Sequence, residues 1–324
     1  MENASVNTIA TPQTSAVKPG SSRQVIASVQ VFLGGASYGV MATTYKLAYA
    51  AGFTSNQMVA GQAWLALTIF ALLVLLNRVR GKRIAKLNAK TVFKLMGFGM
   101  LTCVTSILYC YAMSVLPAPV ALTLLFQFTW IGLVIQAITT RRMPHICQIM
   151  AAVIIMAGTV FASGLYATDL SSLDPVGIVC ALGASVSCAL FVTLSGKVQA
   201  DCSPAQRGMI VVAGSAILSL VACPDFFPSG VLFQGFAPYA AIAALFALCL
   251  PVILFGLGTP HLPSGVCTIL SAAELPMGLL VAMIVLSTPM GVVEWVGVAT
   301  VLAGVVLAQA PSFASRARTA SVDA

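Results

Sequence analysis

Residues 117–138 read PAPVALTLLFQFTWIGLVIQAI, and residues 263–284, 146 positions later, read PSGVCTILSAAELPMGLLVAMI. The same offset continues without a gap to residues 160 and 306. Identical residues recur across it at Pro117, Val120, Leu124, Gly132, Leu133, Ile138, Ala157, Gly158 and Val160. Shared apolar composition alone would give roughly half as many identities, so the constant offset with matched proline and glycine indicates an internal duplication.

The composition around this duplication is that of a membrane protein. Hydrophobic residues make up 59% of the 324 positions and charged residues only 7%, whereas about a quarter of the residues in soluble domains are charged. So few charges cannot form a water-soluble surface. The apolar stretches are continuous rather than alternating, which predicts membrane-spanning helices of roughly 20 residues and not the strands of a barrel.

Ten apolar segments are predicted to span the bilayer in an all-α membrane protein. They cover residues 25–45, 58–77, 95–115, 119–139, 146–165, 176–195, 208–223, 238–258, 264–286 and 292–310. The first segment could be a signal peptide cleaved at Ala48-Tyr49-Ala50, but its apolar run exceeds the roughly 7–15 residues of a signal core. Residues 1–24 and 311–324 are polar and are expected to be disordered tails.

The basic residues predict the orientation of these segments. With the N-terminus in the cytoplasm, every Lys and Arg falls at a cytoplasmic end except Lys46, in agreement with the positive-inside rule. Both termini, which carry Lys18 and Arg318, are therefore expected in the cytoplasm, and this requires an even number of spans. The basic run from Arg78 to Lys94 could indicate nucleic-acid binding, but its position between two spans favours contact with anionic lipid and no nucleic-acid partner.

The duplication divides the chain into two halves. We predict a first five-helix repeat over residues 25–165, an outer linker over residues 166–175 and a second five-helix repeat over residues 176–310. Because each repeat has an odd number of spans, the second copy is expected to lie inverted in the membrane. Inverted-topology repeats are the architecture of secondary transporters, in which a substrate site near the midplane is reached from each side in turn.

Three short motifs carry a resemblance to a known family. They are GASYG at Gly35 to Gly39 with Lys46 following, AELP at Ala273 to Pro276, and the helix ends at Ala157-Gly158 and Leu302-Ala303-Gly304. From about Ser28 to Gln309 the chain resembles the EamA group of the drug/metabolite transporter superfamily. The resemblance implies ten spans in two inverted five-helix repeats. It also implies that the fifth and tenth spans lie outside a central cavity.

Glu274 is the one ionisable residue expected near the middle of the bilayer, roughly 15 Å into the ninth span. A charge there costs at least ~2.5–3.5 kcal/mol on insertion scales, so such residues usually face a cavity or a partner. We interpret Glu274 as a site that binds protons or a substrate amine; the alternative is a neutral acid bonded to a neighbouring helix. Pro276 and Pro251 are predicted to free the carbonyl groups of Ala272 and Ala247, or only to kink their helices.

The other candidate substrate-binding residues are polar or aromatic side chains that helical spacing aligns on single faces of the first, third, fourth and ninth spans. They are Tyr38, Tyr45, Tyr109, Gln127, Trp130, Thr268 and Ser271. For each one taken alone, ordinary helix packing is the stronger explanation. Because no Lys, Arg or His is expected at mid-depth, the predicted substrate is an amine, amino acid, zwitterion or apolar cation rather than a phosphorylated anion.

Other chemistry has little support. The sequence contains no HExxH, GxSxG or Walker motif, and His145 and His261 lack the spacing of metal ligands. We therefore expect no enzyme activity, metal or cofactor. The predicted function is a proton-coupled secondary transporter that exports a small organic metabolite across the cell membrane. An uncoupled facilitator or an uptake carrier is the alternative within this class, and an intramembrane enzyme or a membrane scaffold is the alternative outside it. The oligomeric state stays open.

Overall fold

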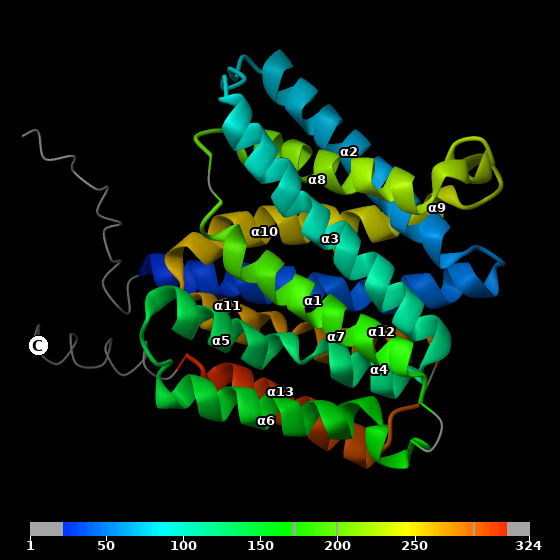
Figure 1. Ribbon diagram of the computed structural model, residues 1–324, viewed down its shortest axis with the longest axis vertical. Helices are drawn as coiled ribbons and strands as arrows, with labels where there is room; N and C mark the ends of the chain where they lie inside the picture. The colour runs from blue at the N-terminus through cyan, green and yellow to red at the C-terminus, as the bar shows by residue number, and fades with distance from the viewer. Residues whose placement is uncertain (1–21, 171–172, 199, 288, 310–324) are drawn as a thin grey trace, which may run out of the picture.

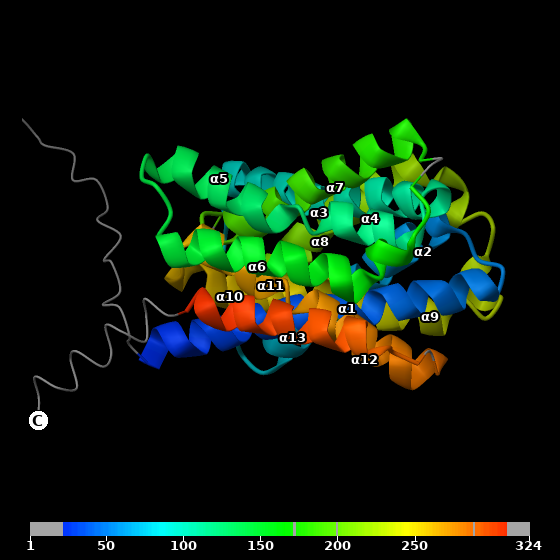
Figure 2. The same ribbon diagram turned by 90° about the horizontal axis from the view of Figure 1, so that it is seen from below.

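The computed structural model describes residues 22–170, 173–198, 200–287 and 289–309, and the regular structure in these ranges is helical, without strands (Figure 1). The predicted tails lie almost wholly outside the described residues, together with Lys18, Arg316 and Arg318. The helices run side by side, and the links between them gather at two opposite edges of the molecule (Figures 1 and 2).

Nine helical units among the described residues are long and apolar enough to cross a membrane. They are α1 (Ser22–Ala50), α2 (Ser55–Val79), α3 (Ala89–Val115), α4 with α5 (Ala118–Leu125 and Phe128–Thr140), α6 (Ile146–Ser163), α7 (Pro175–Ser195), α8 (Pro204–Ala222), α9 to α10 (Ala237–Ala243 and Leu250–Gly258, joined by the π-helix η4 at Ala244–Cys249) and α11 with α12 (Ser264–Ser271 and Glu274–Leu286). The apolar helix α13 (Val292–Leu307) has 16 residues. The chain is thus a multi-pass helical membrane protein, and a helix occupies each of the ten predicted segments.

Capping residues determine where several helices begin. Thr54 and Gln57 form a reciprocal capping box at α2, and Asp174 accepts two amide hydrogen bonds at the start of α7. Asn88, His145 and Ser203 cap α3, α6 and α8 through their side chains in the same way. These bonds satisfy amide groups that have no partner inside the first helical turn.

Two spans break near their middle, and the two breaks are 146 residues apart. The φ and ψ angles are −65° and −6° at Phe126, and −63° and −8° at Ala272. The next amide in each span bonds three residues back, from Gln127 to Leu124 (3.3 Å) and from Ala273 to Leu270 (3.2 Å). Each break is therefore a short 3₁₀ turn, and both spans end in a non-glycine residue with φ near +50°, at Arg141 and Ser287.

Pro276 does not leave a carbonyl free in the way predicted. The carbonyl of Ala272 is not free, because it accepts the amide of Leu275 at 3.2 Å. The break also does not depend on Pro276, since the first break has the same geometry with Trp130 at the equivalent position. Pro251 is the second residue of α10, two positions after the π-helix η4 ends at Cys249. A local π-helical turn is one way in which a membrane helix accommodates a proline, and release of the carbonyl of Ala247 stays a prediction.

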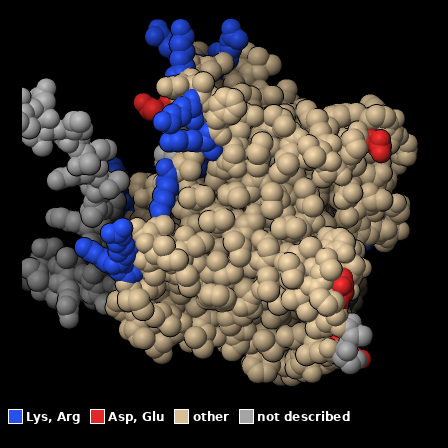
Figure 3. Space-filling model, in the orientation of Figure 1, with Lys and Arg blue, Asp and Glu red and all other residues tan. Residues whose placement is uncertain are grey.

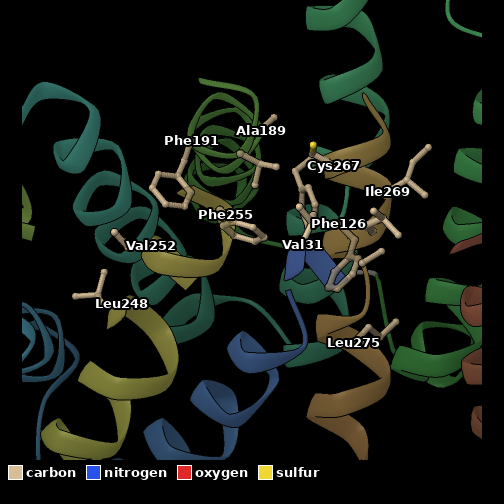
Figure 4. Packing of buried hydrophobic residues seen from close by; sticks show 14 of the residues in the cluster. Val31, Phe126, Ala189, Phe191, Leu248, Val252, Phe255, Cys267, Ile269 and Leu275 are labelled. Atoms are coloured by element: carbon tan, nitrogen blue, oxygen red, sulfur yellow. The ribbon is translucent and has the colours of Figure 1, made fainter. Parts of the chain in front are cut away.

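Helix pairs meet in a reciprocal pattern. α1 packs against α12 and α10, while α7 packs against α5 and α3; α2 packs against η4 and α9, while α3 packs against α8. α6 and α13 pair with each other at one side of the molecule (Figures 1 and 2). Buried aromatic and aliphatic side chains, including Phe126, Phe191 and Phe255, fill the centre between these pairs (Figure 4).

Charged side chains mark the two edges. Figure 3 shows Lys and Arg along the edge that holds the α2–α3 and α5–α6 links, and most of the visible Asp and Glu at the opposite edge. We call the edge with the α2–α3, α5–α6 and α7–α8 links the basic edge. We call the edge with the α6–α7, α8–α9 and α12–α13 links the acidic edge.

The close contact between α3 and α8 gives a test of this packing. A methyl group at Gly99 would overlap the carbonyl oxygen of Val211, whereas a methyl group at Gly97, on the same helix, would meet nothing within 4 Å. We expect Gly99→Ala to lower the free energy of unfolding by about 1–3 kcal/mol, as overpacking does. Gly97→Ala should leave it unchanged or raise it by up to about 1 kcal/mol. Thermal unfolding in detergent measures both effects. Equal unfolding midpoints for the two variants would contradict the close approach of α3 and α8.

Candidate functional site

The main cavity has a volume of about 410 Å³ and lies between α1, α3, α4, α6, α12 and α13. Lys46, Pro289 and Glu294 line it at the acidic edge, and Glu274 and Phe126 line it at mid-depth. Most of its other lining residues are apolar or aromatic: Met41, Ala42, Tyr45, Tyr49, Tyr109, Met113, Leu122, Leu275, Leu279, Ala282, Leu286 and Met290. The cavity is large enough for an organic molecule and has few polar groups, as is usual for small-molecule sites.

A smaller chamber of about 50 Å³ lies deeper than the main cavity. Its lining includes five residues that bear hydroxyl groups, together with Cys188 and Phe191; the five are Tyr38, Thr102, Thr105, Ser106 and Tyr109. Met41, Tyr109 and Glu274 line both spaces. These three residues therefore form the boundary between a wide apolar vestibule and a small hydroxyl-rich chamber.

Glu274 is the first residue of α12, immediately after the 3₁₀ turn that interrupts its span. A carboxylate in the first turn of a helix is favoured by the helix dipole. The side chain is half-buried, and its carboxylate makes no hydrogen bond or ion pair within the described part of the chain. Its oxygen atoms are therefore available to a ligand in either space.

Tyr45 has a partner outside the cavity. Its hydroxyl donates to Gln62 Oε1 at 2.8 Å, and Gln62 Nε2 donates to Ser106 Oγ at 3.3 Å. The ring of Tyr45 lines the vestibule while its hydroxyl ties α1 to α2 and α3. Gln62 was not among the sequence candidates; a lone amide within an apolar span was the signal that could have found it.

Four of the eight predicted binding residues come together around the two spaces: Glu274, Tyr38, Tyr45 and Tyr109. The structure places the other four elsewhere. Trp130 is 44% exposed on the outer surface, and its indole donates to Gln127 Oε1 at 2.7 Å. Thr268 is buried and donates to the carbonyls of Thr129 and Gly265, and Ser271 donates to Cys267.

Gln127 and Trp130 keep the helix face that they were predicted to share with Thr123, because Gln127 Nε2 donates to the carbonyl of Thr123 at 3.1 Å and Trp130 donates to Gln127. This face borders neither of the two spaces. Tyr49, Lys46 and Glu294 also line the cavity and were not predicted as site residues from the sequence. Tyr49 continues the stripe of Met41 and Tyr45 on α1 at a spacing of four residues and could have been found in that way.

The mouth of the cavity carries one further polar contact. Tyr166, outside the spans, donates its hydroxyl to Glu294 Oε1 at 3.1 Å. This hydrogen bond raises the pKa of the Tyr166 hydroxyl above its ordinary value. No group of three His, Cys, Asp or Glu side chains within the described ranges is arranged to hold a metal ion.

Comparisons with known proteins extend to the fold only. No family model and no curated protein sequence matches this chain. A crystal structure described only as that of a protein superposes on it with a TM-score of 0.69 at 12% sequence identity, over 89% of this chain and 98% of the other. At this identity the match shows that the two chains share a fold.

Glu274 has no hydrogen-bond partner within the described residues and Gln62 has two, so their substitution should affect stability differently. Glu274→Gln removes no hydrogen bond or ion pair, so we expect the free energy of unfolding in detergent to change by less than about 0.5 kcal/mol. Gln62→Leu leaves the buried Tyr45 hydroxyl without its acceptor and should cost about 1–3 kcal/mol. A loss for Glu274→Gln as large as that for Gln62→Leu would indicate that the carboxylate holds helices together.

Proposed function

We propose that this chain is a secondary transporter of a small organic metabolite that works by alternating access. One observation carries the proposal: a carboxylate without a protein partner lies at the base of a cavity that reaches the acidic edge. Charged groups at such depth are costly and usually serve a ligand or ion pathway. A scaffold protein has no need of this arrangement, and a hydrolytic enzyme would need a second catalytic group beside Glu274.

The packing supports ten spans in two inverted five-helix repeats. Two breaks with matching backbone angles occur 146 residues apart, and helix pairs meet reciprocally across the molecule. In this arrangement α13 is the tenth span. Its 16 residues make about 24 Å of helix, which pairs with α6 on the outside of the bundle. The resemblance to the EamA group, based on Gly35 to Gly39 and Ala273 to Pro276, favours the same architecture.

The cavity favours an amine, amino acid, zwitterion or apolar cation as substrate. Glu274 supplies a negative charge, and the rings of Tyr45, Tyr49 and Tyr109 can contact an apolar or cationic body. We place the basic edge and both termini in the cytoplasm and the protein in the cell membrane, by the positive-inside rule. The vestibule then opens outward, where a proton can displace a substrate from Glu274, as export by proton exchange requires.

Flux measurements test the proposal and its coupling residue. The probes are radiolabelled phenethylamine, phenylalanine and tetraphenylphosphonium in proteoliposomes with an imposed pH gradient. We expect pH-driven flux of at least one probe, and a loss of at least about tenfold in Glu274→Gln. Asp225→Asn, at the acidic edge, is the matched control and should keep full flux. Equal proton-driven flux in Glu274→Gln would remove its coupling role, and pH-independent flux would favour the facilitator.

The orientation has a separate test in two native cysteines. Cys202 lies in the α7–α8 link at the basic edge, and Cys223 follows α8 at the acidic edge. Partial burial raises the pKa of both thiols, so labelling needs an alkaline buffer. We expect an impermeant maleimide to label Cys223 in intact cells and Cys202 only after permeabilisation, as measured by site-resolved mass spectrometry. The reverse pattern would invert the proposed topology.

A further inference from the structure

Aromatic rings from four helices lie between the small chamber and the basic edge. Tyr38 on α1 is 6.2 Å from Phe255 on α10, measured between ring centroids, and Phe255 is 6.1 Å from Phe191 on α7. Phe191 stacks on Phe98 of α3 at 4.8 Å with an interplanar angle of 10°. Figure 4 shows Phe191 and Phe255 beside each other, and their rings meet edge to face at 66°. Phe191 lines the chamber and is buried, so this stack separates the chamber from the basic edge.

Arg207 covers the far side of the stack. Its guanidinium carbon lies 5.6 Å from the centre of the Phe98 ring. Its Nη2 donates to the carbonyl of Ser195 at 3.1 Å and to that of Val198 at 3.3 Å, and its Nη1 donates to the carbonyl of Val252 at 3.4 Å. One side chain thus joins α8 to the end of α7, to the α7–α8 link and to α10, above a ring of α3.

The bonding of this arginine is incomplete. The side chain is only 5% exposed, yet none of its hydrogen-bond acceptors is a carboxylate, and its Nε has no partner. Neutral carbonyls at the negative end of α7 compensate a buried cation only in part. If these contacts opened, water would hydrate the guanidinium and offset much of the free energy lost with its hydrogen bonds. A contact of this kind can form and break as a protein changes between two states.

Arg207 also lies between helices that are held together by several contacts and α10, to which it makes one long hydrogen bond. The neighbouring Gln206 exchanges two hydrogen bonds with the backbone of Ala85, at 2.8 and 3.0 Å, and so holds the start of α8 on the α2–α3 link. The close contacts at Gly99 and Gly214 hold α8 to α3. Of the arginine's hydrogen bonds, only the one to the carbonyl of Val252, at 3.4 Å, reaches α10, where its guanidinium also packs against Gly256.

We propose that Phe98, Phe191 and Phe255 form the closed inner gate of the transporter and that Arg207 is the positioning residue that keeps it closed. This inference rests on the proposed function. Opening toward the basic edge separates α10 from α7 and α8. It breaks the bond from Arg207 to Val252, exposes the guanidinium to water and connects the chamber with the cytoplasm.

Native Cys188, in the wall of the chamber, reports the state of this gate. The full-length protein is treated in inside-out membrane vesicles with an impermeant trimethylammonium thiosulfonate, and Cys188 modification is followed by site-resolved mass spectrometry. We expect slow modification in the native protein and a rate at least about tenfold higher in Arg207→Gln, because the open population rises. Arg207→Lys keeps the charge but loses the planar fork and should lie between them. Arg142→Gln, at an exposed arginine of the basic edge, is the matched control and should behave as native.

Phe191→Ala supplies a second variant in case Arg207→Gln does not fold, and folding is checked by size-exclusion elution. Phe191→Ala should also speed modification, because it removes the floor of the chamber. A native rate of Cys188 modification in a folded Arg207→Gln or Phe191→Ala variant overturns the gate. Modification requires no substrate, so a native rate with intact probe flux overturns the gate alone. If Cys188 is modified faster in these variants but the native protein carries no flux of any probe, the transport function is overturned instead.

Discussion

Hydrocarbon offers no hydrogen-bond partners, and this constraint accounts for most of the structure. Every backbone amide in a span must find its acceptor inside the protein, which leaves helices as the regular element. The same rule governs the breaks, where amides bond three residues back instead of four. It also governs the hydroxyl groups of the chamber wall, since Thr102 and Thr105 donate to the backbone of their own helix. Buried side-chain atoms without such a partner are few among the described residues: Thr43 Oγ1, Trp64 Nε1, Arg207 Nε and Gln309 Nε2.

Glu274 and Arg207 are two charged side chains that meet this rule only in part. The carboxylate has no protein partner within the described residues but borders a cavity, while the guanidinium is buried with an unsatisfied Nε. Several other polar side chains at mid-depth bond to the backbone or to each other, as Thr268 does with Thr129 and Tyr45 with Gln62. Water or a ligand can therefore lower the energy of the structure at Glu274 and Arg207.

The helices could be predicted from the sequence because hydrophobic length is a strong signal, and the two matching breaks lie at the constant offset of 146 residues that the sequence shows. Glu274 was found because it is the only carboxylate in a long apolar run. Gln127 and Trp130 do share the predicted face with Thr123, but spacing within one helix does not show which neighbour or cavity that face meets. The pairing of Tyr45 with Gln62 joins different helices, and no spacing within one helix reveals it.

The two breaks share their backbone geometry but not their chemistry. At the first break Phe128 occupies the position of Glu274, and its ring is buried against Phe126 at 5.5 Å. The first break therefore has a buried aromatic side chain at the position where the second break has a carboxylate. Under the proposed cycle, closing the vestibule removes water from Glu274 while opening the inner gate gives water to Arg207. A bare carboxylate resists that dehydration unless it holds a proton or a cationic substrate. Occupancy of Glu274 thus becomes a condition for opening the inner side, which is the requirement for coupled exchange.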